Sequence, residues 1–95
     1  MAAIEVSAQS AGEGWRAEVV VRDGRSETRH AVTLTAADLE RFAPGASDPT
    51  DLVRASFFFL LEREPKESIL RSFALPVIGR YYPEYEAEIR RRIGG

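Results

Sequence analysis

Cysteine is absent from this chain of 95 residues, and histidine occurs once, as His30. Without cysteine the chain can form neither a disulfide framework nor a thiolate metal site. A metal or catalytic site would have to combine His30 with carboxylates, and no partner motif accompanies it. His30 alternates in phase with Val32 and Leu34, so we predict a half-buried structural histidine, with no metal and no cofactor.

Long apolar runs are also absent. No stretch approaches the roughly 20 apolar residues that a transmembrane helix needs. The start, MAAIEVSAQS, has neither the basic region nor the apolar region of a signal peptide. We therefore expect a soluble cytoplasmic protein that does not contact a membrane.

Motifs for catalysis are missing as well. The glycines of GEG at 12–14 lack the strand and helix context of a phosphate-binding loop. The acidic stretches EREPKE and PEYEAE lie in predicted short amphipathic helices, where carboxylates usually face solvent. Nothing places two carboxylates across a pocket, so we predict a non-enzymatic protein without catalytic residues.

The composition is that of a small globular domain. Hydrophobic residues make up 44% and charged residues 29% of the chain, and the formal net charge is -2. A chain of this length forms one domain, here residues 1–95, with a limited core. Its acidic balance argues against general nucleic-acid binding, which usually requires a basic domain.

The N-terminal part alternates apolar and polar residues with the period of two that is typical of half-buried strands. One such run covers 15–22 and a second covers 28–34, with Asp23 and Gly24 as the turn signal between them. Ile4 and Val6 continue the same period. We therefore predict a hairpin or three-stranded meander, in which residues 1–13 form a short strand and a flexible loop.

Helical patterns follow the strands. Thr35, with Asp38 three residues later, predicts a capping box at the start of a short helix. Asp48 and Pro49 predict the start of the main helix, which we place at 49–64.

Prolines divide the C-terminal part of the chain. Pro65 suits the start of a short helix that carries Ile69, Leu70 and Phe73, and Pro83 opens the last helix. We interpret the final Gly94-Gly95 pair as a helix end. The predicted fold class is therefore α+β, with the strands followed by about four helices.

The predicted main helix is apolar on more than one side. Val53, Phe57 and Leu60 share one face, Phe59 lies on a second, and Phe58 lies between them. Two interpretations stay open, because a small domain has little interior to spare. The C-terminal helices could cover the second face within one chain, or a second copy of the chain could cover it.

Tyrosines gather around Pro83, and such residues are frequent at interfaces but also seal the ends of cores. We predict a protein-interaction module that forms a homodimer or binds another protein. The predicted interface residues are Phe58, Phe59, Tyr81, Tyr82 and Tyr85.

Arginines cluster near the outer face of the predicted hairpin, as a phosphate-binding surface would require. Glu18 and Glu27 lie among them, which favours a solvated sheet face over a nucleic-acid site. The residues for possible nucleic-acid contact are Arg16, Arg22, Arg25 and Arg29.

The stretch LVRASFFFLLEREPKESILRSFALPVIGRYYPEYE, from Leu52 to Glu86, and the earlier RHAVTL resemble a family of short, functionally uncharacterised bacterial proteins. The resemblance covers a little over half of the chain, and LLEREPKESIL and RYYPEYE are its most specific parts. It implies a bacterial protein and carries no activity that could be transferred.

A second resemblance concerns the pattern alone. A strand RHAVTL, a short helix AADLERFA and a longer helix PTDLVRASFFFLLERE resemble a ribbon-helix-helix unit. In that family two chains pair their strands into a ribbon that enters the major groove, and the second helices form the dimer core. The resemblance implies a DNA-binding regulator or antitoxin-type protein that reads DNA through Arg29 and Thr33, our alternative to the interaction module.

Overall fold

Long antiparallel strands form the first part of the chain. In the computed structural model, which describes residues 2–94, they are β1 (Ala3–Ala11), β2 (Gly14–Asp23) and β3 (Ser26–Thr35). A two-residue turn joins each strand to the next, and its first residue is a glycine with positive φ, 58° at Gly12 and 65° at Gly24. Only this first turn residue has a positive φ, which is the type II′ geometry that suits the strand twist. The predicted three-stranded meander is thus confirmed.

β1 is longer and more regular than the sequence predicts. It pairs with β2 along its whole length, from Ala3 opposite Arg22 to Ala11 opposite Gly14. The flexible loop predicted within residues 1–13 is therefore wrong, apart from the turn itself; Met1 lies outside the described residues. Small and polar residues on both faces of this strand weaken the hydrophobic alternation that reveals the other strands.

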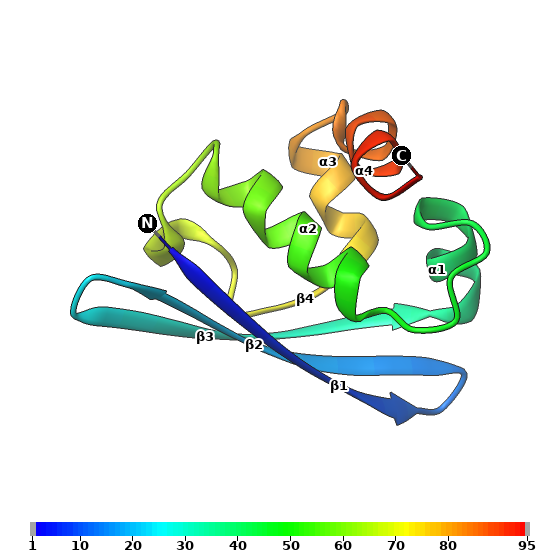
Figure 1. The fold of residues 1–95 in the computed structure, drawn as a ribbon, viewed down its shortest axis with the longest axis horizontal. Helices are drawn as coiled ribbons and strands as arrows, with labels where there is room; N and C mark the ends of the chain where they lie inside the picture. The colour runs from blue at the N-terminus through cyan, green and yellow to red at the C-terminus, as the bar shows by residue number, and fades with distance from the viewer. Residues whose placement is uncertain (1, 95) are drawn as a thin grey trace.

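Four α-helices lie on one face of the sheet in the described part of the chain (Figure 1). They are α1 (Ala36–Phe42), α2 (Thr50–Leu61), α3 (Ile78–Tyr81) and α4 (Tyr85–Gly94). Gly94 is thus helical, whereas Gly95 lies outside the described residues. None of these helices is both long enough and apolar enough to cross a membrane.

A side-chain cap defines where α1 begins, whereas the N-cap residue of α2 is Pro49, which has no side chain that could cap the helix. The Thr35 hydroxyl accepts a hydrogen bond from the Asp38 N–H at 3.0 Å, and the Asp38 carboxylate accepts one from the Thr35 N–H at 2.9 Å. This reciprocal pair is the predicted capping box. Just before α2, the Asp48 carboxylate accepts from the Thr50 N–H at 2.7 Å. Hydrogen bonding to the Thr50 side chain, and then to this N–H, holds the pKa of Asp48 below its usual value.

The segment after Pro65 forms a strand in place of the predicted helix. One 3-10 turn covers Lys66–Ser68, and β4 (Ser72–Ala74) then pairs in parallel with β3 at the edge of the sheet. The helix prediction for Phe73 is wrong because pairing with a distant strand outweighs the local propensity. A second 3-10 turn, Leu75–Val77, leads from β4 into α3.

α2 is buried on two sides. Towards the sheet, Phe57 packs against His30 of β3 and Phe73 of β4, with ring centroids 5.2 and 6.1 Å apart. Towards α4, Phe59 packs against Tyr85 at 5.3 Å. The second apolar face is therefore covered within one chain, which is the first of the two interpretations left open by the sequence.

His30 is a buried structural residue with both ring nitrogens in hydrogen bonds. Its Nδ1 donates to the Leu70 carbonyl at 2.8 Å, since a carbonyl can only accept. Its Nε2 consequently accepts from the Thr28 hydroxyl at 2.9 Å. The ring thus ties β3 to the segment that leads into β4.

Tyr85 joins α4 to α2 through a buried hydrogen bond. The Ser56 hydroxyl donates to the Leu52 carbonyl at 2.7 Å, so the Tyr85 hydroxyl donates to Ser56 Oγ, also at 2.7 Å. Burial raises the pKa of the Tyr85 hydroxyl above its usual value. Both residues are fully buried, so neither group can turn to water if its partner is removed.

We expect Phe57→Ala to lower the free energy of unfolding by about 3–5 kcal/mol, because a fully buried phenylalanine leaves a cavity. The neighbouring Phe58 is 43% exposed and provides the matched control. Phe58→Ala should cost about 1 kcal/mol or less. Urea unfolding of both variants checks the assignment, and similar midpoints for the two would contradict it.

We expect Ser56→Ala and Tyr85→Phe to be non-additive. Ser56→Ala leaves the buried Tyr85 hydroxyl without its acceptor, at a cost of about 1–3 kcal/mol, whereas the double variant removes both groups. The double variant should therefore be more stable than the sum of the single effects predicts, by about 0.5–3 kcal/mol. A double-mutant cycle in urea measures this coupling, and a coupling of zero would contradict the hydrogen bond.

Candidate functional site

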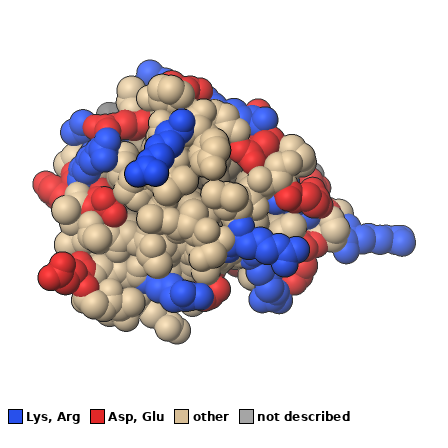
Figure 2. Space-filling model, turned by 180° about the vertical axis from the view of Figure 1, so that it is seen from behind, with Lys and Arg blue, Asp and Glu red and all other residues tan. Residues whose placement is uncertain are grey.

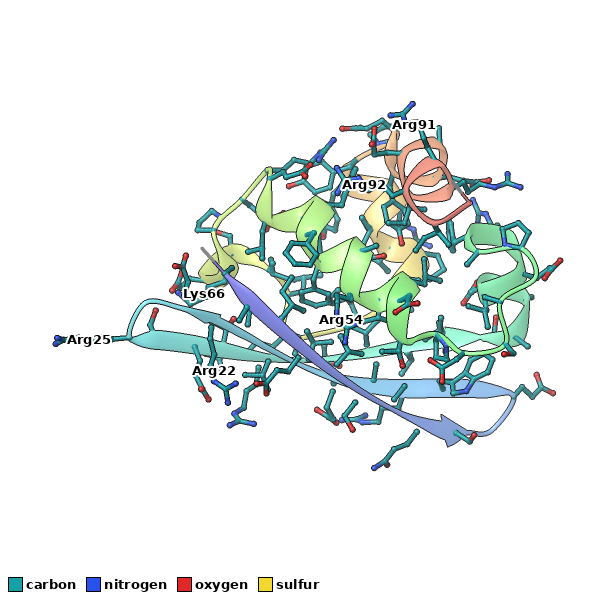
Figure 3. All side chains as sticks on the ribbon, in the orientation of Figure 1. Arg22, Arg25, Arg54, Lys66, Arg91 and Arg92 are labelled. Atoms are coloured by element: carbon teal, nitrogen blue, oxygen red, sulfur yellow. The ribbon has the colours of Figure 1, made fainter. Side chains whose placement is uncertain are left out.

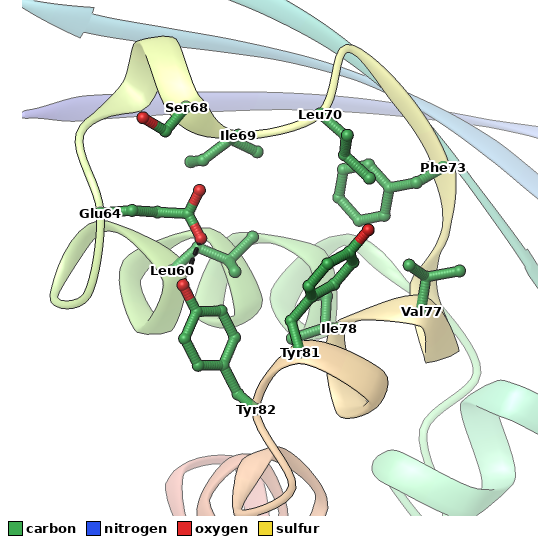
Figure 4. Close-up of a pocket in the computed structure, with 10 residues that line it drawn as sticks. All are labelled: Leu60, Glu64, Ser68, Ile69, Leu70, Phe73, Val77, Ile78, Tyr81 and Tyr82. Atoms are coloured by element: carbon green, nitrogen blue, oxygen red, sulfur yellow. Dashed lines mark hydrogen bonds between the residues drawn. The ribbon is translucent and has the colours of Figure 1, made fainter.

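An apolar pocket of about 130 Å³ opens between the end of α2, the segment before β4 and α3 (Figure 4). We call it the Tyr81 pocket. Its lining includes the apolar and aromatic side chains of Leu60, Leu70, Phe73, Val77, Tyr81 and Tyr82. Small-molecule sites usually enclose about 300–1,000 Å³, whereas a cavity near 150 Å³ holds a group the size of benzene. The pocket therefore has room for one apolar side chain.

Exposed apolar side chains border this pocket. Tyr81 is 66% exposed and Leu70 is 46% exposed, and Figure 4 shows the Tyr81 ring reaching towards Leu70 and Phe73. Phe58 is the remaining large apolar side chain at the described surface. A gathering of exposed apolar groups beside a pocket is typical of a binding surface.

One wall of the pocket is formed by Tyr82, which is held in place by contacts with Glu64 and with the buried Phe59. The Tyr82 hydroxyl donates a hydrogen bond to the Glu64 carboxylate (Figure 4), and the Tyr82 ring packs edge-on against Phe59 at 5.9 Å. The Arg63 guanidinium lies 3.6 Å from the centre of the Phe59 ring. The hydrogen bond to Glu64 is the main cause that raises the pKa of Tyr82, and burial adds to it.

The opposite wall is fixed to the sheet. The Leu70 carbonyl accepts the hydrogen bond from His30, and the next carbonyl, of Arg71, accepts from the Ala31 N–H at 2.7 Å. Phe73 follows in β4, opposite Val32. These bonds hold the backbone at Leu70 and directly after it, so the Leu70 side chain projects from a positioned segment.

Unpaired arginines adjoin the exposed residues of the pocket. Arg71 follows Leu70 and Arg80 precedes Tyr81 in the sequence. Within residues 2–94 neither forms an ion pair, which among the basic residues is otherwise true only of Arg25. Figure 2 shows the face turned away in Figure 1, where uncharged residues occupy the middle and charged residues surround them. The pocket thus has an apolar opening with one carboxylate, that of Glu64, in its lining, and the two arginines are sequence neighbours of its exposed residues.

The predicted interface residues divide into two groups. Phe59 and Tyr85 are fully buried in the core, because α4 folds over α2. Tyr81 and the half-buried Tyr82 line the pocket, and Phe58 lies elsewhere, beside Ala2 and Leu61. Of the five predicted interface residues, Phe58, Tyr81 and Tyr82 are therefore accessible to a partner.

Three of the four arginines considered for nucleic-acid contact are paired with carboxylates, and Arg25 is the exception. Arg16 pairs with Glu18 at 3.1 Å, and Arg22 and Arg29 share Glu27 at 3.1 and 3.0 Å. Figure 3 shows Arg22 on the side of the sheet opposite the helices, and Arg25 projecting from the hairpin tip. This face has no marked excess of positive charge, which disfavours phosphate binding.

The ribbon-helix-helix arrangement also lacks a free strand. The strand that would form the ribbon is β3, and it pairs with β2 along its length and with β4 at 31–33. A second chain could not pair with β3 there without displacing β4. The position of β3 inside the sheet therefore argues against DNA reading through Arg29 and Thr33.

Sequence patterns alone do not reveal the pocket. The sequence predicts Leu70 and Phe73 within a short helix, and they come together with Leu60 only through the parallel pairing of β4. The available signal is the pair Ile69 and Leu70, adjacent apolar residues of which one must be exposed in an extended segment.

Within residues 2–94, no group of three or more histidine and acidic side chains is placed to hold a metal ion. No family model, curated protein or solved structure matches this chain. The proposals below therefore rest on the geometry of the described residues.

We expect Glu64→Gln to lower the pKa of Tyr82 towards its ordinary value of about 10, because the carboxylate stabilises the neutral phenol. Spectrophotometric titration of phenolate absorbance measures the shift, with Tyr82→Phe identifying the signal. A raised pKa in the folded state means that this contribution to stability is present below about pH 10 and is lost as Tyr82 ionises.

Glu67→Gln is the matched control, because Glu67 pairs with Lys66 and not with Tyr82. Its titration curve should match that of the wild type. Equal shifts in both variants would contradict the role of Glu64.

Proposed function

We propose that this chain is a small, non-enzymatic protein-interaction module whose Tyr81 pocket holds one apolar side chain of a partner protein. The observation that carries the proposal is the position of Tyr81 and Leu70, which are the most exposed large apolar side chains among residues 2–94 and border the same pocket. Exposed apolar side chains lower solubility and do not stabilise the fold. A partner protein that covers Tyr81 and Leu70 would remove them from water.

The size of the pocket favours a protein partner over a small ligand. A volume of about 130 Å³ suits an aliphatic or aromatic side chain, and is too small for most cofactors. An anchor side chain that enters such a pocket commonly dominates the affinity of an interface.

The arginines next to Leu70 and Tyr81 in the sequence favour an acidic partner segment. Arg71 and Arg80 adjoin the exposed apolar residues and have no carboxylate partner among residues 2–94. Aspartate or glutamate on either side of the anchor would supply one. We therefore propose a partner segment with a single large apolar residue flanked by acidic residues.

A random 12-residue peptide library displayed on phage tests this specificity with the immobilised protein. We expect enrichment of peptides that place an apolar residue between acidic ones. Tyr81→Glu should weaken binding of the selected peptides at least tenfold, a difference of about 1.4 kcal/mol.

Thr33→Glu is the matched control, because it introduces the same charge at an exposed position on the open face of the sheet. It should leave peptide binding unchanged. Enrichment of basic peptides, equal binding to the Tyr81→Glu variant, or no enrichment at all would each overturn the proposal.

A further inference from the structure

β1 is a long edge strand with no neighbour on one side. The strand order is β1-β2-β3-β4, so β1 and β4 are the two edges of the sheet. β1 has 9 residues and pairs with β2 without a bulge, whereas β4 has 3 residues. The free edge of β1 therefore presents a regular row of backbone donors and acceptors, and Figure 1 shows this strand at the outer side of the sheet.

β1 lacks the features that usually keep sheet edges from pairing. Natural edges are blocked by lysine, proline, bulges or short length. The sequence of β1, AIEVSAQSA, contains no proline, lysine or arginine, and Glu5 is its one charged residue. Such an edge is a template for another strand.

The turn geometry identifies the backbone groups on the free edge. A two-residue hairpin makes its flanking residues, Ala11 and Gly14, a hydrogen-bonded pair, and such pairs alternate along the ladder. The odd-numbered residues of β1 thus bond to β2. The N–H and C=O groups of Ile4, Val6, Ala8 and Ser10 point outwards.

We propose that β1 pairs with β1 of a second copy in antiparallel orientation, with Ser7 on the two-fold axis. This register pairs the whole strand with itself, and it sets Ala3 opposite Ala11 and Glu5 opposite Gln9. The polar residues on the open face are therefore self-complementary, and the two Glu5 carboxylates do not oppose each other. Because the residues of β1 match themselves in this register, a second copy of this chain is the partner that the strand fits.

The same pairing accounts for Phe58. This side chain is 43% exposed and lies beside Ala2 and Leu61, at the start of β1. Because Ala3 pairs with Ala11 of the second copy, the turn after Ala11 arrives next to Phe58. The inward-facing Val6 and Ala8, which are half-buried in one chain, gain cover from the helical layer of the other.

This inference goes beyond the proposed function, because it concerns a different edge of the sheet. The Tyr81 pocket includes Phe73 of β4, at the edge opposite β1. Loss of dimerisation and loss of peptide binding can therefore be observed separately.

Cysteine cross-linking of the full chain tests the register, because the chain has no cysteine of its own. Ser7→Cys places thiols of the two copies at a non-hydrogen-bonded pair, with Cα atoms about 4.5 Å apart, within reach of a disulfide. We expect mild oxidation to convert this variant to a covalent dimer on non-reducing gels.

Gln9→Cys is the matched control, since Gln9 is also exposed on the open face of β1. Its two copies would lie four residues apart along the strand, about 13 Å, and should not cross-link. Equal cross-linking of both variants, or none with Ser7→Cys, would overturn the proposed pairing.

Light scattering across a dilution series gives the second measurement. The wild type should have twice the chain mass of 10.6 kDa. Ala8→Pro removes an outward N–H without disturbing the ladder to β2, so it should give the single-chain mass with an unchanged circular dichroism spectrum. A monomeric wild type at tens of micromolar would overturn the inference whatever the fate of the proline variant.

Discussion

The two-sided apolar character of α2 is the constraint on which the rest of the structure depends. Phe57 faces the sheet and Phe59 faces α4, and both are fully buried. Each fully buried phenylalanine is worth about 1.5–3 kcal/mol of transfer free energy, so neither face can be left in water. The sheet covers the face of α2 that carries Phe57. The C-terminal part of the chain folds back over α2, so that α4 covers the face that carries Phe59. β4, α3 and the Tyr81 pocket all lie on the path of that return.

Ion pairs between α4 and the end of α2 help to orient α4, but they contribute little to the free energy of folding. Arg63 lies over the Phe59 ring and pairs with Glu84 at 3.2 Å, while Arg92 of α4 bonds to Glu62, at the end of α2. Arg92 is the main cause that holds the pKa of Glu62 below its usual value. Exposed ion pairs are each worth about 1 kcal/mol or less, so the buried contact of Phe59 with Tyr85 dominates the energy. The contact of Arg92 with Glu62 joins two helices that are far apart in sequence, so it depends on the tertiary structure.

Local chemistry explains which parts of the fold the sequence predicts. The alternation of 15–22 and 28–34, the turn at Gly24 and the Thr35 capping box each depend on residues close in sequence, and all of them are found. β4 is a three-residue strand whose partner lies some forty positions earlier, so nothing local marks it. The Tyr81 pocket depends on β4, which is why Tyr81 and Tyr82 were identified as surface candidates but their neighbours Leu70 and Phe73 were not.

The order of the strands makes the two proposed surfaces compatible. β1 and β4 are opposite edges of one sheet, with β2 and β3 between them. A dimer joined through β1 leaves both Tyr81 pockets uncovered, each near the β4 edge of its own sheet. Such a dimer presents two equivalent sites, so a partner that carries two anchor segments binds the second as an intramolecular step. Avidity of this kind can exceed single-site affinity by about 10²–10⁴, provided that the linker spans the distance. A pocket that holds one side chain, and is therefore weak alone, becomes an effective binding site when the fold supplies it in pairs.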